Sequence, residues 1–195
     1  MITYQVATTG EPEWFTVQNH RPEGAVGPKT EGYMRYISGT GFEVVMRCFE
    51  KNPKAVYSQP DDPVFQDSCM EAFINFFPEL PEYGYLNVEV NANGAARCRF
   101  GVGRQDRGWL REMGIDHPQI TVTREEDFWQ IHVMITEALL EKLYERPCRF
   151  AAGHEMRGNF YKCGEETDPP HWVSWTVLDR LEFHMPARFG LLKIV

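Results

Sequence analysis

The 195-residue sequence has few basic residues and no long apolar run. Lys and Arg number 20 against 28 Asp and Glu, which gives a formal net charge of −8 at pH 7. Nucleic-acid binding depends on cations that neutralise phosphates, so we expect no nucleic-acid partner. The longest uncharged apolar runs contain only a few residues, whereas a helix that crosses a bilayer needs roughly 20. We therefore expect no membrane partner either.

Several catalytic and targeting motifs are also missing. The sequence contains no G-x-S-x-G nucleophile elbow and no G-x-x-x-x-G-K-[ST] phosphate loop. The opening MITYQVATTG has neither the basic region nor the apolar core of a signal peptide. The five cysteines are an odd number without C-x-x-C spacing, which argues against a zinc motif or a disulfide framework. These features predict a cytoplasmic protein with reduced, mostly buried thiols.

The sequence does contain many short alternating runs, separated by Gly and Pro. Runs at 43–49, 69–76, 85–91, 119–123 and 129–133 are rich in β-branched and aromatic residues. This pattern predicts an all-β fold, an antiparallel β-sandwich that forms one domain over residues 1–195. Residues 137–144 are predicted as a short connector helix, with Thr136 as its N-cap and Pro147 beyond its end. Residues 103–118 are predicted as a long loop.

The Asn-Gly pair inside residues 92–94 marks a β-hairpin. A two-residue loop would place Arg97 and Arg99 on the apolar face of the preceding strand. A three-residue loop over 92–94 instead pairs Glu89 with Arg97 and Asn87 with Arg99. Because the hydrophobic pattern sets strand register, we predict the three-residue loop.

Polar side chains recur on one face of the predicted strands. If the strand at 69–75 pairs with the strand at 85–91, this face gathers Glu71, Asn75, Asn87, Glu89, Asn91, Arg97 and Arg99. A further strand at 155–161 alternates Arg157, Asn159 and Tyr161 against Met156 and Phe160. Carboxylates, amides and guanidinium groups beside aromatic rings suit the hydroxyls and C–H faces of sugars. The alternative is a solvated sheet face with cross-strand ion pairs.

Four blocks of sequence resemble, in order, the family 9-like carbohydrate-binding modules. They are residues 67–73 (DSCMEAF), 85–94 (YLNVEVNANG) and 158–164 (GNFYKCG), and a closing pair at 171–175 (HWVSW) and 183–190 (FHMPARFG). The resemblance implies a DOMON-like β-sandwich that binds a mono- or oligosaccharide, such as a chain end, without catalysis.

Carried over to this sequence, the resemblance also implies roles for individual residues. Phe65 and Trp175 would be aromatic platforms, and Glu71 would be the carboxylate. Together with the polar face, the candidate carbohydrate-binding residues are Phe65, Glu71, Asn87, Glu89, Arg97, Arg99, Asn159, Tyr161, His171 and Trp175. Trp172 is also placed near the polar face, without an assigned role.

Some of these residues also fit functions other than sugar binding. Glu71 and Glu89 on neighbouring strands could lie about 5 Å apart, the spacing of a retaining glycoside hydrolase. The pairs His154/Met156 and His132/Met134 could provide axial ligands to haem. The resemblance allows structural calcium, but no Asp-x-Asp-x-Asp loop is present and Asp61-Asp62 is read as a solvated turn. We therefore assign no catalytic residue, cofactor or metal.

Overall fold

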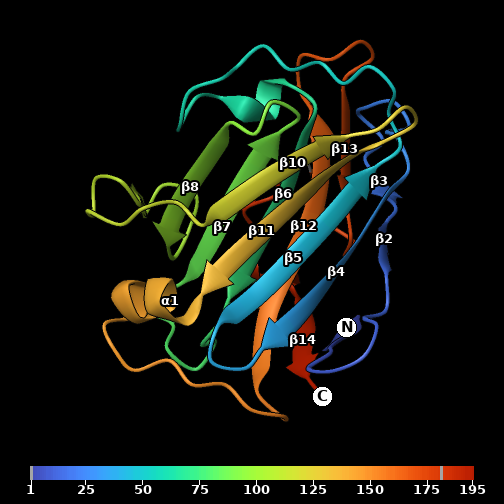
Figure 1. The fold of residues 1–195 in the computed structure, drawn as a ribbon. Helices are drawn as coiled ribbons and strands as arrows, with labels where there is room; N and C mark the ends of the chain where they lie inside the picture. Colours follow the sequence, from blue (N-terminus) through green and yellow to red (C-terminus); the bar gives the residue numbers. More distant parts are fainter. Residues whose placement is uncertain (1, 181) are drawn as a thin grey trace.

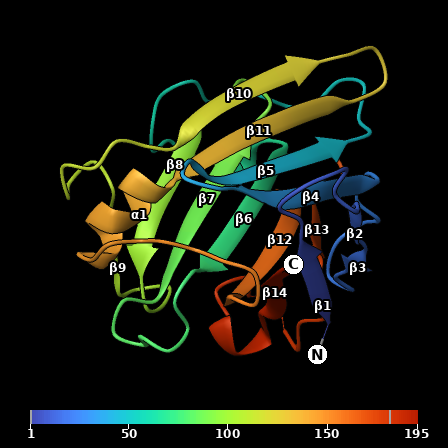
Figure 2. The same cartoon turned by 60° about the horizontal axis from the view of Figure 1, so that its bottom comes forward.

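Two β-sheets pack face to face in the computed structural model, which describes residues 2–180 and 182–195 (Figure 1). Figure 2 separates the two layers, with β10, β11, β5 and β4 in one and β8, β7, β6 and β12 in the other. The larger sheet runs in the order β1 (Thr3–Val6), β14 (Gly190–Ile194), β12 (Glu155–Gly164), β6 (Cys69–Asn75), β7 (Tyr85–Asn91), β8 (Ala96–Gly101) and β9 (Arg107–Trp109). At its side, β13 (His171–Ser174) pairs with β12 and with β3 (Asn19–His20).

The smaller sheet has the order β10 (Gln119–Arg124), β11 (Trp129–Thr136), β5 (Gly41–Cys48), β4 (Thr30–Ile37) and β2 (Phe15–Val17). Its strands pair antiparallel, and in the larger sheet only β1 and β14 pair parallel among the described strands. Strands β4 and β11 alternate buried with half-buried residues, as expected when one face of a sheet packs on a core. The predicted all-β antiparallel sandwich is confirmed.

The core lies between the two sheets and is built from the apolar member of each alternating pair. Phe42, Val44 and Met46 from β5 and Met70 and Ile74 from β6 belong to this one buried cluster. Each such side chain contributes roughly 1.5–3 kcal/mol when it is removed from water. The apolar rows therefore turn inward, and the polar row of β6, β7 and β8 is left on the outer face of the larger sheet.

The predicted helix is also confirmed. Helix α1 (Glu137–Tyr144) begins after Thr136, whose side chain accepts a hydrogen bond from the Leu139 N–H. It ends where Glu145 adopts a left-handed conformation with φ of 50°. Figures 1 and 2 place α1 at one end of the sandwich, directly after β11. Among the described residues, no helix is both long and apolar enough to span a membrane.

The hairpin between β7 and β8 has the predicted three-residue loop. Glu89 lies opposite Arg97 and Asn87 lies opposite Arg99, and the turn closes with Gly94 at a φ of 83°. The expected loop at 103–118 needs a correction, because residues 107–109 form β9 at the edge of the larger sheet. The five cysteines are all buried and none is in a disulfide.

Candidate functional site

The outer face of the larger sheet carries a pocket of about 470 Å³, which falls in the size range of small-molecule sites. Strands β6, β7 and β8 provide its polar floor, and connecting segments provide its walls. Its lining residues are Phe65, Glu71, Glu89, Arg97, Arg99, Arg104, Gln105, Arg107, Glu165, Trp172, Glu182, Phe183 and His184. Charged groups of both signs therefore meet aromatic rings in one cavity.

Two buried carboxyl groups form the centre of the floor. Glu71 on β6 lies directly opposite Glu89 on β7, and Arg97 on β8 lies opposite Glu89 on the other side. Burial raises the pKa of both carboxyl groups above the ordinary value. The thiol of Cys163 and the charge of Glu89 raise the pKa of Glu71 further, whereas Arg97 acts in the opposite direction on Glu89.

Hydrogen bonds hold these carboxyl groups in place. Glu89 accepts a hydrogen bond of 2.8 Å from the side-chain amide of Asn87, and its second oxygen lies 3.8 Å from Arg97 Nε. Arg107 in turn donates to the side-chain oxygen of Asn87. Asn87 thus lies behind the floor and links a carboxyl group to a guanidinium group. Such a linked set of polar groups keeps its members in fixed positions.

The arginines of the floor rest on aromatic rings. The guanidinium carbon of Arg97 lies 4.6 Å from the ring centre of Trp109 and 5.2 Å from that of Phe65. The guanidinium carbon of Arg99 lies 4.7 Å from the Trp109 ring. These distances fit cation–π contacts, which orient the planar donors. The oriented guanidinium groups can then donate paired hydrogen bonds to a ligand.

His184 closes another side of the pocket as a neutral side chain. Its Nε2 lies 3.3 Å from a guanidinium nitrogen of Arg107, which can only donate, so Nε2 accepts. The proton therefore lies on Nδ1, which is 2.8 Å from the hydroxyl of Tyr85. Burial, together with Arg107 and Arg104, lowers the pKa of His184 to about 2.

Aromatic rings gather beside this charged floor. Phe65 of the short 3-10 helix η1 (Val64–Gln66), Trp172 of β13 and Phe183 are each half-buried and pack against one buried apolar cluster. Tyr161 on β12 supports this aromatic wall from behind, since its ring stacks on Phe183 at 4.1 Å and its hydroxyl donates to the Phe183 carbonyl. The pocket thus offers partly exposed ring faces next to hydrogen-bonding groups.

Five of the ten residues expected from the sequence line the pocket, namely Phe65, Glu71, Glu89, Arg97 and Arg99. Asn87 and Tyr161 lie directly behind it, as described above. The other three lie elsewhere. Asn159 is fully buried and joins β12 to Thr176, with hydrogen bonds to the Thr176 N–H and hydroxyl.

His171 and Trp175 also lie outside the pocket lining. His171 accepts a hydrogen bond from Lys162 Nζ at 2.8 Å, and burial lowers its pKa to about 4. Trp175 is 3 % exposed and packs between the sheets against Phe15 and Phe160. Because successive strand residues alternate between faces, position 172 takes the outer face and position 175 takes the inner one.

The pocket also uses residues that the sequence analysis missed. Arg104, Gln105 and Arg107 come from the predicted loop, and Glu165 follows β12. Glu182, Phe183 and His184 come from the segment before β14. Phe183 and His184 lie in the block at 183–190, in which the resemblance implied no site residue, and no sequence pattern pointed to Glu182.

The two His/Met pairs considered as haem ligands do not face a common cavity with the pocket residues. His154 contacts the carbonyl of Phe76, and Met156 is buried in the core between the sheets. His132 contacts Glu43 in the smaller sheet, whereas the pocket lies on the larger sheet. Neither pair contributes to the lining of the pocket.

The fold and the pocket together define a β-sandwich binding module. The chain belongs to Carbohydrate-binding family 9, whose sequence pattern it matches over residues 37–194. A comparison with curated protein sequences finds no match.

Solved structures share the fold. A crystal structure of a candidate carbohydrate-binding protein from Bacteroides uniformis is 22% identical, with a TM-score of 0.77 over 100% of this chain and 98% of that one. A family 9 module from Caldicellulosiruptor kristjanssonii in complex with cellotriose is 11% identical, with a TM-score of 0.70 over 99% and 93% of the chains. The structure of a family 9 module from the same organism in complex with glucose is also 11% identical, with a TM-score of 0.73 over 100% of this chain and 96% of that one.

Proposed function

We propose that the pocket on the outer face of the larger sheet binds the end of a carbohydrate chain or a small saccharide, without covalent chemistry. The observation that carries this proposal is the meeting of half-buried rings with carboxyl and guanidinium groups in one cavity of about 470 Å³. Sugars present C–H faces that pack on rings and hydroxyls that need both donors and acceptors. Family membership supports the same function.

Each part of the pocket has a role in this proposal. Trp172 and Phe65 provide the ring faces on which a pyranose lies. Arg97 and Arg99 donate to hydroxyl oxygens, and Glu89 accepts from hydroxyl groups. The ring of Trp172 takes the role that the resemblance gave to Trp175, because Trp172 lines the pocket and Trp175 does not.

The class of sugar is proposed from the related structures. The Caldicellulosiruptor module was solved with glucose and with cellotriose, and it shares this fold. A glucose unit at a chain end is therefore the first ligand to test. Walls from residues 104–107 and 182–184 rise beside the floor, which favours a chain end over a long chain that passes across the sheet.

Isothermal titration calorimetry with glucose, cellobiose, cellotriose and a panel of other monosaccharides tests this proposal. We expect binding by the parent protein, and binding at least tenfold weaker in Trp172→Ala. Trp14→Ala is the matched control, because Trp14 is 42% exposed and packs on Tyr33 and Arg47 outside the pocket. Absence of binding to every sugar, or equal loss in both variants, would contradict the proposed site.

We also propose a reducing compartment such as the cytoplasm for this protein. Five buried cysteines without a disulfide support this placement. A disulfide between buried cysteines in protein isolated from its native host, detected by mass spectrometry, would argue against it.

A further inference from the structure

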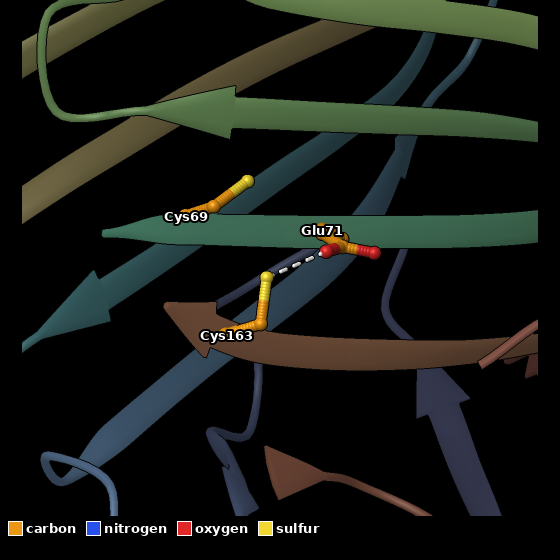
Figure 3. A group of neighbouring side chains, drawn as sticks. All are labelled: Cys69, Glu71 and Cys163. Atoms are coloured by element: carbon orange, nitrogen blue, oxygen red, sulfur yellow. Dashed lines mark hydrogen bonds between the residues drawn. The ribbon is translucent and has the colours of Figure 1, made fainter. Parts of the chain in front are cut away.

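Two cysteines and one carboxyl group meet beneath the aromatic wall of the pocket. Cys69 on β6 lies directly opposite Cys163 on β12, and Glu71 follows on the same face of β6 (Figure 3). The Cys163 thiol donates to Glu71 Oε1 at 3.0 Å. One ligand atom from each residue, two sulfurs and one carboxylate oxygen, lies within 4.8 Å of the other two. Among the described residues this is the one group of three that could hold a metal ion.

We propose that Cys69, Cys163 and Glu71 form a binding site for a thiophilic divalent cation, with Zn²⁺ as the first candidate. Zinc binds thiolate sulfur at about 2.3 Å and carboxylate oxygen at about 2.0–2.2 Å in tetrahedral geometry. Two zinc-bound sulfurs are then roughly 3.8 Å apart. Atoms already within 4.8 Å of one another need only small side-chain movements to reach these positions.

The donor set favours a soft or borderline cation over calcium or magnesium. Calcium and magnesium take oxygen ligands, whereas thiolates select zinc and similar metals. All three side chains are at most 3% exposed, so water does not compete strongly with them as a ligand. A mixed sulfur and oxygen set of three ligands matches zinc sites that keep a further position open.

The charges around the cluster also favour a cation. Metal binding would release the thiol protons, because the thiolate is the form that binds a metal. Glu89 lies opposite Glu71, and Glu165 lines the pocket two residues after Cys163. These carboxyl groups counter the positive charges of Arg97 and Lys162, which lie near Glu89 and the thiols respectively.

The position of the cluster connects it to the pocket. Glu71 lines the cavity, while the two cysteines lie under Phe65, Trp172 and Phe183. Three protein ligands leave a fourth position for a water molecule, on the side where Glu71 lines the cavity. A bound ion would also join β6 to β12 directly below the aromatic wall and hold the floor of the pocket in place.

Zinc binding by the full, reduced chain tests the site without any sugar. The apo protein is titrated with Zn²⁺ alone, and the bound metal is counted by mass spectrometry under native conditions. We expect one Zn²⁺ per chain, and thiolate-to-metal charge-transfer absorption when Co²⁺ replaces it. Cys69→Ala and Cys163→Ala should weaken zinc binding at least a hundredfold. Cys98→Ala is the matched control, because Cys98 is an equally buried thiol in the core between the sheets.

Glu71→Gln keeps the shape of the side chain, so it tests the site even if the cysteine variants fail to fold. It should weaken zinc binding at least tenfold while the thiolate absorption with Co²⁺ remains. In addition, Zn²⁺ should raise the melting temperature of the parent and of Cys98→Ala, but not that of Cys69→Ala. The proposal is overturned if the reduced parent binds no Zn²⁺, if the cysteine and glutamine variants bind it as the parent does, or if Cys69 and Cys163 form a disulfide that persists under reductant.

Discussion

Glu71 and Glu89 face one another across β6 and β7, and Glu89 faces Arg97 across β7 and β8. This row places two carboxyl groups and one guanidinium group side by side on the floor of the pocket. Its members differ in their partners, because Glu71 accepts from a thiol and Glu89 accepts from the amide of Asn87. Glu89 therefore lies beside a guanidinium group and an amide donor. We expect this carboxyl group to accept a hydrogen bond from a sugar hydroxyl.

We predict that Glu89→Gln weakens sugar binding about tenfold, or about 1.4 kcal/mol. The substitution keeps the shape of the side chain but replaces a charge-assisted acceptor with a weaker neutral one. Calorimetry with the tightest-binding saccharide of the panel measures the change. Glu155→Gln is the control, because Glu155 is exposed on the same sheet and pairs with Lys193 away from the pocket. Equal affinities for the Glu89 variant and the parent would remove Glu89 from the proposed site.

The hydrolase hypothesis concerns the same two carboxyl groups. The matched family is described by carbohydrate binding alone. Glu71 has a thiol, not a sugar-facing donor, as its hydrogen-bond partner. We therefore expect no release of aryl alcohol from aryl β-glucosides. Turnover by the parent that is lost in Glu71→Gln would contradict a binding-only function.

The raised pKa of Glu71 predicts a particular pH dependence of stability. In the unfolded chain the Glu71 carboxyl group ionises at about pH 4.3, whereas in the folded protein it keeps its proton to higher pH. Between these values the folded state binds more protons, so the free energy of unfolding falls as pH rises through the folded pKa. In a chelator-containing buffer, Glu71→Gln should therefore gain stability relative to the parent between pH 5 and pH 8. Urea denaturation at several pH values measures the difference, and a constant difference would contradict the raised pKa.

The position of Trp175 predicts a change in stability and not simply in binding. Its ring packs against Tyr4, Phe15 and Phe160 between the sheets. Removal of a buried large aromatic side chain costs about 3–5 kcal/mol, so Trp175→Ala should lower the free energy of unfolding by that amount. Urea denaturation checks this, with half-buried Trp172→Ala as the matched comparison. A loss of less than about 1 kcal/mol in Trp175→Ala would show that its packing matters little.

The faces and register of the central strands could be predicted from the sequence, because alternation fixes which side chains share a face. The pairing of Glu89 with Arg97 followed from the apolar pattern of the same hairpin. The same rule separates Trp172 from Trp175, because they are three positions apart and an odd offset places two side chains on opposite faces. The resemblance implied a platform role for Trp175 from its position in the block at 171–175, which does not consider the face of the strand.

The walls of the pocket could not be predicted in this way. Arg104 and Glu182 form an ion pair of 2.9 Å between segments that are far apart in the sequence. Loop positions of this kind depend on tertiary contacts, which period-two alternation does not report. The cysteine cluster shows the same limit. Cys69 and Cys163 have no motif spacing, and they meet only because β12 is placed beside β6.

The neutral state of His184 gives the final prediction. Arg107 donates to its Nε2, so the proton stays on Nδ1 beside the Tyr85 hydroxyl. With its pKa lowered to about 2, His184 should not titrate between pH 8 and pH 5. Nitrogen-15 NMR of the histidine rings should show the Nδ1–H tautomer throughout this range, whereas an unperturbed histidine changes charge near pH 6.5, roughly. Because the unfolded histidine takes up a proton below that pH and the folded one does not, the free energy of unfolding should fall as pH drops. Titration of the His184 ring near pH 6 would contradict the arrangement.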